Sequence, residues 1–240
     1  TSQDAFRITR NTIFLNTLFI IASTVCSVIF ALLMFEISKK AFIKLYQTVA
    51  ILPMFLSWVV VGAISYIFLE PNSGVINQVL ITLGVEPISW YSDPEKWPAI
   101  LTFINTWKGV GYGSIVYYAA LMGINSEFFE AAEVDGANKL QRAWYISIPS
   151  LIPIITIMTI LSIGNIFRAD FGLFYNVTRN IGALYPSTDV IDTYVFRGLT
   201  KLGNIGMSAA VGLFQSAVGF FLILITNYVT KKIEPDNALF

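Results

Sequence analysis

Long runs without a charged residue constrain this chain more than any other feature. Residues 13–35, 45–69, 146–167 and 205–230 contain no Asp, Glu, Lys or Arg. Each run exceeds the roughly 20 residues that an α-helix needs to cross about 30 Å of hydrocarbon. A fifth stretch of similar length, residues 98–124, contains a single charge, Lys108. The sequence therefore predicts five membrane-spanning helices.

The composition favours a membrane protein over a soluble one. Of the 240 residues, 55% are hydrophobic and 12% are charged, whereas soluble domains carry roughly 25% charged residues. A globule of this size cannot bury five such helices, but a bilayer accommodates them. We therefore expect one all-α domain over residues 1–240, a polytopic helix bundle.

The residue inventory removes several classes of function. The chain has no histidine, a single cysteine, Cys26, and a formal net charge of zero. Histidine-based metal sites, a Ser–His hydrolase and an internal disulfide are thereby excluded, and nothing suggests a nucleic-acid partner. We expect no catalytic and no metal-binding residue.

The distribution of lysines orients the predicted helices. Lysine pairs directly follow the first and the last run, on the side that also receives the loop 125–145. Because positive charge concentrates in cytoplasmic loops, we expect this loop and the C-terminus in the cytoplasm, and the loop 168–204 outside. An external N-terminus, together with the missing initiating methionine, predicts at least one further span upstream.

The loop 125–145 contains a charged turn, residues 130–139, with the sequence EAAEVDGANK. We expect Ser126 to cap a first short helix, Gly136 to end it in the left-handed region, and Asn138 with Gln141 to cap a second helix. This hairpin either lies on the bilayer interface or docks into a groove of a soluble partner. The side chains that it would expose are Phe128, Phe129, Ala131, Ala132 and Leu140.

The sequence EAAEVDGANKLQRAWYISIP resembles the cytoplasmic signature of ABC importer permeases. The signature has Glu-Ala-Ala, three residues, Gly, nine residues, Ile, one residue, an aliphatic residue and Pro. Its positions are filled by Glu130, Ala131, Ala132, Gly136, Ile146, Ile148 and Pro149. The resemblance implies that the loop is a coupling helix, gripped by an ATP-hydrolysing subunit. It places Glu130, Asp135 and Gly136 in that role, with Ala131 and Ala132 as the contact face.

The resemblance also implies partners and an energy source. The chain contains no Gly-x-x-x-x-Gly-Lys-Ser/Thr phosphate-binding loop. ATP and Mg²⁺ are therefore expected on two ATP-binding partner subunits, beside a second homologous permease, an extracellular solute-binding protein and the lipid bilayer. The segments DTYVFR and NALF resemble the polysaccharide and oligosaccharide branch. An amino-acid or other small-solute permease, and a secondary transporter driven by an ion gradient, remain alternatives.

The outer halves of two predicted spans hold candidates for the solute pathway. Residues 109–113 read GVGYG, similar to a potassium-channel filter, but they lie inside a continuous span, so we expect close helix packing or a break in the span there. Lys108 either pairs or snorkels, or it lines the pathway. Aromatic and polar side chains suit sugars, although aromatics here also form interfacial belts. The candidates are Trp107, Lys108, Asn165, Asp170 and Tyr175.

The spacing of apolar residues from 190 to 202 predicts an amphipathic helix in the outer loop.

Overall fold

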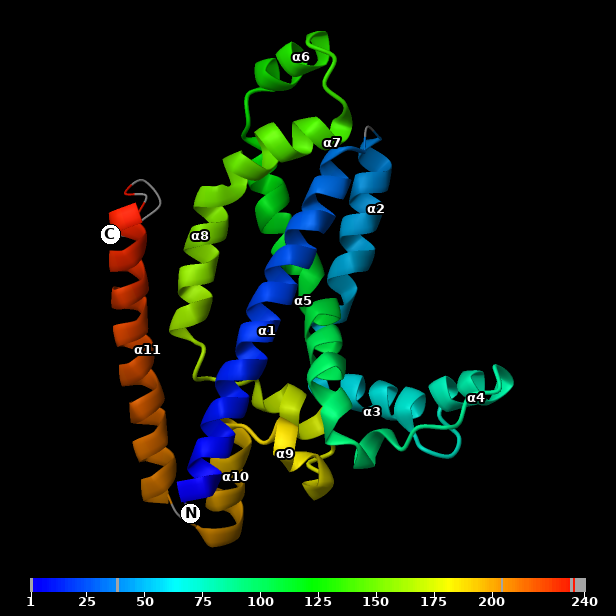
Figure 1. Ribbon diagram of the computed structural model, residues 1–240, viewed down its shortest axis with the longest axis vertical. Helices are drawn as coiled ribbons and strands as arrows, with labels where there is room; N and C mark the ends of the chain where they lie inside the picture. Colours follow the sequence, from blue (N-terminus) through cyan, green and yellow to red (C-terminus); the bar gives the residue numbers. More distant parts are fainter. Residues whose placement is uncertain (1, 38, 204, 234, 236–240) are drawn as a thin grey trace. The chain divides into compact units, whose positions relative to one another are not determined.

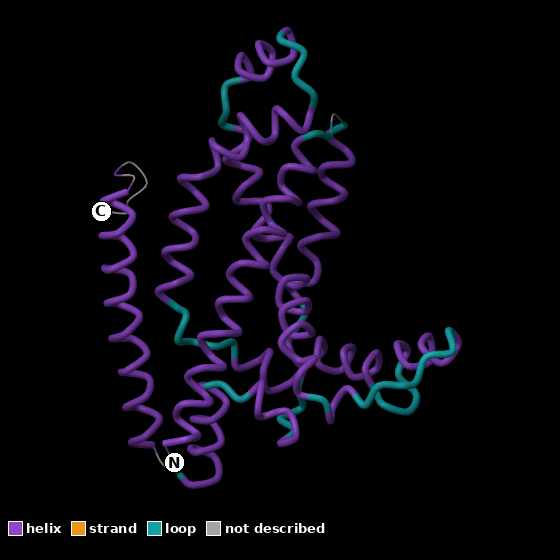
Figure 2. The backbone as a smooth tube through the Cα atoms, viewed as in Figure 1, coloured by secondary structure: helices purple, strands orange, loops and turns teal. Residues whose placement is uncertain are grey.

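The computed structural model describes residues 2–37, 39–203, 205–233 and 235, and it contains helices and loops but no strand within these ranges (Figures 1 and 2). The α-helices are α1 (Ser2–Phe35), α2 (Lys40–Ile51), α3 (Trp58–Leu69), α4 (Val75–Thr82), α5 (Trp97–Met122), α6 (Ser126–Val134), α7 (Lys139–Arg142), α8 (Ile148–Gly164), α9 (Tyr185–Thr188), α10 (Ile191–Leu202) and α11 (Ile205–Ile233). The short 3₁₀ turns are η1 (Leu52–Phe55), η2 (Trp90–Ser92), η3 (Pro94–Lys96) and η6 (Gly182–Leu184), and the π turns are η4 (Ala143–Ser147) and η5 (Leu173–Val177).

Three helical segments in the described part of the chain are long and apolar enough to cross a membrane. They are Asp4–Phe35, Lys139–Gly164 and Ile205–Lys232, and Lys40–Phe55 with Trp58–Leu69 forms a fourth as a broken pair. Helix α5 matches the expected stretch 98–124 and is 26 residues long, but its composition is less apolar. The membrane character is therefore clear, while the count of five spans stays a prediction.

Residues 45–69 do not form one continuous helix, and this part of the expectation was wrong. The helix α2 ends in the turn η1, which contains Pro53, and α3 begins only at Trp58. Proline has no N–H for the helical ladder and clashes with the preceding turn. Ser57 then starts the new helix, because its Oγ accepts the N–H of Val60 at 3.4 Å.

The chain divides into two compact units. The first contains Thr1–Phe19, Leu56–Asn105 and Asn165–Gly219. Its core is built from fully buried side chains of α1, α5 and η5, and Val61 of α3 joins them. Apolar residues repeat along α10 as expected, and the described side chains of this helix include buried Ile191. The largest fully buried side chains in this core include Leu15, Trp97, Leu101, Leu173 and Phe174.

The second unit contains Ile20–Phe55, Thr106–Gly164 and Phe220–Phe240. Ala31 of α1, Tyr117 and Leu121 of α5 and Leu151 of α8 form its buried cluster. These contacts place the C-terminal end of α1 beside the helix α8. The charged loop 125–145 belongs wholly to this unit.

The GVGYG segment serves helix packing within the second unit. It lies in the interior of α5. A Cβ on Gly111 would collide with the carbonyl of Ala50 in α2, and a Cβ on Gly113 would lie 2.5 Å from Ser27 Oγ in α1. Glycine is needed at both positions because two neighbouring helices approach α5 closely there.

The second helix of the charged loop runs into α8 without a break. The helical segment covers Lys139–Gly164, whereas a separate short helix over 139–145 was expected. The π turn η4 joins α7 to α8, and the N–H of Ile148 bonds to the carbonyl of Ala143. This wider turn immediately precedes Pro149, which cannot donate to the ladder. α7, η4 and α8 therefore form one continuous helical segment.

Candidate functional site: the charged elbow

We call residues 125–142 the elbow. Its first half is α6, and its cap differs from the expected one. Asn125 is the N-cap, because its Oδ1 accepts the N–H of Glu127 at 3.1 Å, and Ser126 is the first helical residue. Asn and Ser cap helices almost equally well. Glu127 lies in the first turn, where the helix dipole favours a negative charge.

The helix α6 ends at a left-handed glycine, as predicted. Gly136 has φ +79°. Its N–H bonds to the carbonyl of Glu133 at 3.0 Å, and the N–H of Ala137 bonds to the carbonyl of Ala132 at 2.8 Å. These bonds satisfy carbonyls that the end of a helix leaves free. The turn is therefore hydrogen-bonded and defined.

The helix α7 begins with the predicted capping box. The backbone N–H of Asn138 donates to Gln141 Oε1 at 2.8 Å, and the N–H of Gln141 donates to Asn138 Oδ1 at 2.9 Å. Both ends of the connection between α6 and α7 are thus fixed by side-chain or backbone hydrogen bonds. Figure 2 shows the short loops that flank α6.

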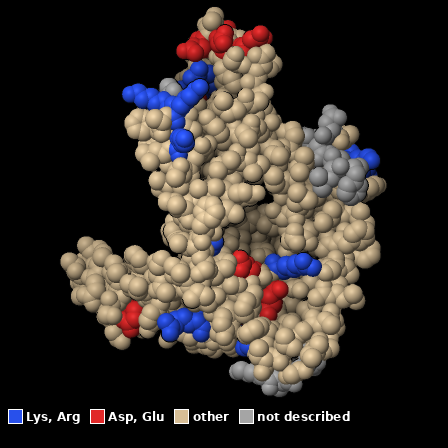
Figure 3. Space-filling model, turned by 180° about the vertical axis from the view of Figure 1, so that it is seen from behind, with Lys and Arg blue, Asp and Glu red and all other residues tan. Residues whose placement is uncertain are grey.

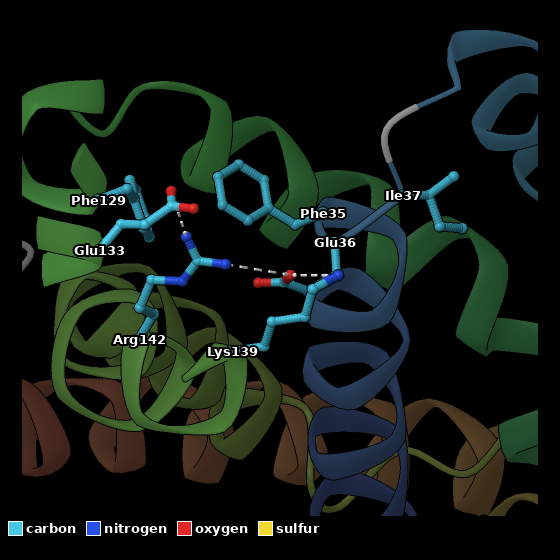
Figure 4. A pocket seen from close by; sticks show the side chains of 7 residues that line it. All are labelled: Phe35, Glu36, Ile37, Phe129, Glu133, Lys139 and Arg142. Carbon is cyan, nitrogen blue, oxygen red and sulfur yellow. Dashed lines mark hydrogen bonds and ion pairs between the residues drawn. The ribbon is translucent and has the colours of Figure 1, made fainter. Parts of the chain in front are cut away.

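One face of α6 packs against the end of α1. The rings of Phe129 and Phe35 lie 5.4 Å apart between centroids. Phe129 is therefore half-buried, although an isolated hairpin was expected to expose it. Beside this contact lies a pocket of about 350 Å³ (Figure 4). It is lined by Phe35, Glu36, Ile37, Phe129, Glu133, Lys139 and Arg142.

Four charged side chains cross this pocket (Figure 4). Glu36, which follows α1, lies 3.3 Å from Lys139 Nζ and 3.9 Å from Arg142. The other terminal nitrogen of Arg142 donates to Glu133 Oε2 of α6 at 3.3 Å. Two cations of α7 thus stand between a carboxylate of α6 and a carboxylate at the end of α1.

The opposite face of α6 is free in the described structure. Phe128 is 61% exposed and Val134 is 87% exposed. Glu130, Ala131, Asp135 and Gly136 are also exposed, whereas Ala132 is half-buried on the inner side. Figure 3 shows acidic side chains gathered over this end of the second unit, with basic side chains next to them. An apolar surface with an acidic border is thereby offered to a partner.

The pathway candidates fall in two different units. Trp107 and Lys108 belong to the second unit, and Asn165, Asp170 and Tyr175 belong to the first. Lys108 Nζ donates to the carbonyl of Met54 at 2.8 Å, at the end of η1. This bond is the structural pairing that was weighed against a pathway role.

Asp170 holds two segments of the first unit together. Its Oδ2 accepts the indole N–H of Trp58 at 2.7 Å, and its Oδ1 accepts the N–H of Gly172 at 2.9 Å. Tyr175 packs against Phe171 and Phe196, with ring centroids 5.0 Å and 5.3 Å away. Asn165 is exposed. Trp58 lies beside Asp170 and was missed, because 112 residues separate the two.

A buried carboxylate fixes the N-terminal part of α1 to the segment 168–204. Asp189 has no exposed side-chain surface and pairs with Arg7 at 3.1 Å and with Arg197 of α10. The next acid, Asp192, accepts the N–H of Ala169 at 2.8 Å. Burial raises the pKa of Asp192 above its ordinary value, and the hydrogen bonds oppose this shift.

Among the described residues, no group of three His, Cys, Asp or Glu side chains could hold a metal ion.

Comparison with known proteins gives the class. Residues 9–235 match the family described as binding-protein-dependent transport system inner membrane component. Protein LplB of Bacillus subtilis (strain 168) is 36% identical over 98% of this chain and 74% of its own length. The polygalacturonan/rhamnogalacturonan transport system permease protein YteP of the same strain is 31% identical over 99% of this chain and 73% of its own length.

The solved structures agree with the sequence comparison. A chain of a bacterial alginate ABC transporter, crystallised in complex with an alginate pentasaccharide-bound periplasmic protein, is 31% identical and superimposes with a TM-score of 0.88. The superposition covers 95% of this chain and 78% of that chain. This chain is a multi-pass membrane permease and belongs to the family of binding-protein-dependent transport system inner membrane components.

Proposed function

We propose that this chain is a membrane-spanning subunit of an ATP-driven importer and that the elbow couples it to a separate ATP-binding subunit. The free face of α6 carries this proposal, because exposed Phe128, Val134 and Ala131 form an apolar strip that no described residue of the second unit covers. An amphipathic helix of this kind fits a groove on a partner. In this arrangement the elbow and the C-terminus face the cytoplasm, and ATP and Mg²⁺ stay on the partner.

The contacts within the elbow are suited to transmitting a displacement of α6 to α8. Rigid connections transmit a displacement better than flexible ones, because each loose dihedral absorbs part of the movement. The elbow has a hydrogen-bonded turn at Gly136, a capping box at Asn138, and a helix that continues from Lys139 through the π turn into α8. Closure of two ATP-binding subunits would push α6 and tilt α8, giving alternating access.

The cargo that we propose is an oligosaccharide delivered by an extracellular binding protein. A relative is named for polygalacturonan and rhamnogalacturonan, and the similar structure is that of an alginate transporter. Asn165, Asp170, Tyr175 and Trp107 supply the polar groups and aromatic faces that sugars need. Together with Lys108, they stay our candidates for the pathway. A second permease would complete that pathway.

The partner of α6 can be identified by photocrosslinking. Benzoylphenylalanine at position 128 in the assembled complex should crosslink to the ATP-binding subunit. The control is the same probe at Leu83, which is 71% exposed in the other unit, and it should give no such product. Crosslinking of position 128 to the external binding protein, or absence of any product with the ATP-binding subunit, would overturn the proposal.

The cargo can be tested by uptake into proteoliposomes that contain the whole complex. Oligogalacturonides, neutral arabino-oligosaccharides and single amino acids should be supplied with the binding protein, with ATP enclosed on the elbow side. ATP-dependent accumulation of an oligosaccharide supports the assignment. Accumulation of amino acids alone, or uptake that an uncoupler abolishes while ATP is present, contradicts it.

A further inference from the structure

The link between the elbow and α1 carries an inference that rests on the proposed function. α6 is joined covalently to α7 and α8, but it reaches α1 only through side chains. These side chains are the ring pair Phe35–Phe129 and the charge chain from Glu36 through the α7 cations to Glu133. They add a direct contact between α6 and α1 to the buried cluster of Ala31, Tyr117, Leu121 and Leu151, which already packs α1 against α5 and α8.

The charge chain differs in exposure along its length. The Arg142 side chain is 17% exposed and that of Glu36 is 30% exposed, whereas those of Lys139 and Glu133 are 67% and 75% exposed. Half-buried pairs are less screened by water and salt than surface pairs. Removal of Glu36 would also leave the charge of Arg142 without one of its two carboxylate partners. Glu36 and Arg142, 3.9 Å apart, are therefore the least screened pair of the chain, and Lys139 adds a closer but more exposed contact to Glu36 at 3.3 Å.

The position of Glu36 connects this contact to the whole length of α1. Glu36 is the first charged residue after the uncharged run 13–35, and its N–H still bonds to the carbonyl of Leu32 at 3.3 Å. It therefore continues the backbone pattern of α1. A force on Glu36 acts along a helix of 34 residues. The two cations that it faces, Lys139 and Arg142, are one helical turn apart on α7.

We infer that Glu36 is the positioning residue that latches the elbow to α1, so that α1 and α8 move together when α6 is displaced. Glu36 does not touch cargo or nucleotide in this account. It acts through Lys139 and Arg142 and keeps the distance between α6 and the end of α1 constant during the cycle. Without Glu36, the Phe35–Phe129 ring pair would be the remaining contact of this link between α6 and α1.

The latch can be tested without knowledge of the cargo. Spin labels at Leu33→Cys and Val134→Cys, in a Cys26→Ser background, report the distance between α1 and α6. Both positions are exposed, and Cys26 is the single cysteine of the sequence. The measurement uses the assembled complex, with cysteine-free partner subunits, in the nucleotide-free state and after trapping with ATP and vanadate. We expect one narrow distance distribution that is the same in both states.

Glu36→Gln should broaden this distribution, with a fall of about fivefold in the ratio of latched to released elbows, the scale expected for a partly buried charge pair. Glu86→Gln, which removes one exposed carboxylate of the other unit, should leave it unchanged. In a Lys139→Gln/Arg142→Gln background, Glu36→Gln should add nothing further, because its partners are already absent. A merely structural Glu36 would lower the yield of the complex without changing the distribution.

The latch would be overturned if the distance distribution stayed narrow in Glu36→Gln. It would also be overturned if Glu36→Gln broadened the distribution as much in the Lys139→Gln/Arg142→Gln background as it does in the parent. The proposed function fails separately: in that case the spectrum of a single label at Val134 would not change when ATP-binding subunits are added. An unchanged Val134 spectrum removes the coupling role, whereas a changed spectrum with an unaffected Glu36→Gln distribution removes the latch alone.

Discussion

Single residues set the geometry of the elbow, and sequence reasoning found those whose role is local. The left-handed Gly136 and the Asn138–Gln141 box were predictable because their partners lie within four residues. The use of Asn125 rather than Ser126 as the N-cap of α6 was not predictable, because the two adjacent residues cap helices almost equally well. Glu36 and Trp58 could not be found from the sequence, because their partners are about a hundred residues away.

Gly136→Ala should loosen the elbow without a steric clash. No atom lies within 4 Å of the Cβ that alanine would add, but its φ of +79° disfavours an L side chain. The expected cost is about 1–2 kcal/mol in the stability of the turn. Hydrogen exchange of residues 126–138 in the purified subunit should accelerate. Gly136→Asn should have a smaller effect, because asparagine tolerates this region, and equal exchange in all three proteins would contradict the account.

The role of Asp170 can be separated from that of its brace to Trp58. Asp170→Ala loses three hydrogen bonds, to Trp58, Gly172 and Leu173, so a loss of uptake in this variant is ambiguous. Trp58→Phe removes the indole donor and keeps an aromatic ring. If Asp170 contacts cargo, Asp170→Asn should lower uptake at least about tenfold in the Trp58→Phe background. Uptake equal to that of Trp58→Phe alone would leave Asp170 a structural residue.

At the scale of elements, uncharged runs predicted where helices lie and capping residues predicted some ends. The runs could not show where a helix breaks. The interruption at residues 52–57 depends on Pro53 and Ser57, both of which are compatible with an apolar membrane helix. Nor could they show that α7 continues into α8, because the π turn depends on how the helix adapts to Pro149.

Lys108 should stabilise the contact between α5 and the turn η1. Lys108→Met removes the donor to the Met54 carbonyl and should lower the stability of the purified subunit by about 1–3 kcal/mol, because a polar group then lacks its partner in apolar surroundings. Lys108→Arg keeps a donor and should retain most of the stability. Thermal unfolding in detergent measures both variants. Equal melting temperatures for Lys108→Met and the parent would exclude this bond as a stabilising contact.

Asp192 should make the first unit more stable at mildly acidic pH. Because burial raises its pKa in the folded state, the folded protein binds a proton more readily than the unfolded chain. Its contribution is therefore favourable below the ordinary value of 3.8 and is lost as pH rises through the raised pKa. As the pH is lowered from about 7 to about 4.5, the melting temperature of the parent should rise relative to that of Asp192→Asn. A constant or decreasing difference would contradict the sign.

For the whole molecule, the sequence predicted the family and the membrane character, whereas the division into two units required the structure. The family and the membrane character were predictable from the signature and the uncharged runs, and the comparisons confirm them. The division into two compact units was not, since each unit combines three separate stretches of chain. The elbow belongs to one unit, and the segment 168–204 with Asp170 belongs to the other. The proposed function requires that a displacement of the elbow change the transport of cargo.

The ratio of cargo transported to ATP hydrolysed tests this requirement most directly. Gly136→Pro removes the N–H that bonds to Glu133 and imposes a φ near −65° where the chain has +79°. Gly84→Pro is a matched lesion in the other unit, because Gly84 has φ +75° and an N–H bonded to Ile81 at 3.0 Å. In proteoliposomes with the complete complex, Gly136→Pro should hydrolyse ATP but lower the ratio at least about tenfold, whereas Gly84→Pro should keep it. A normal ratio in Gly136→Pro would contradict the coupling role of the elbow.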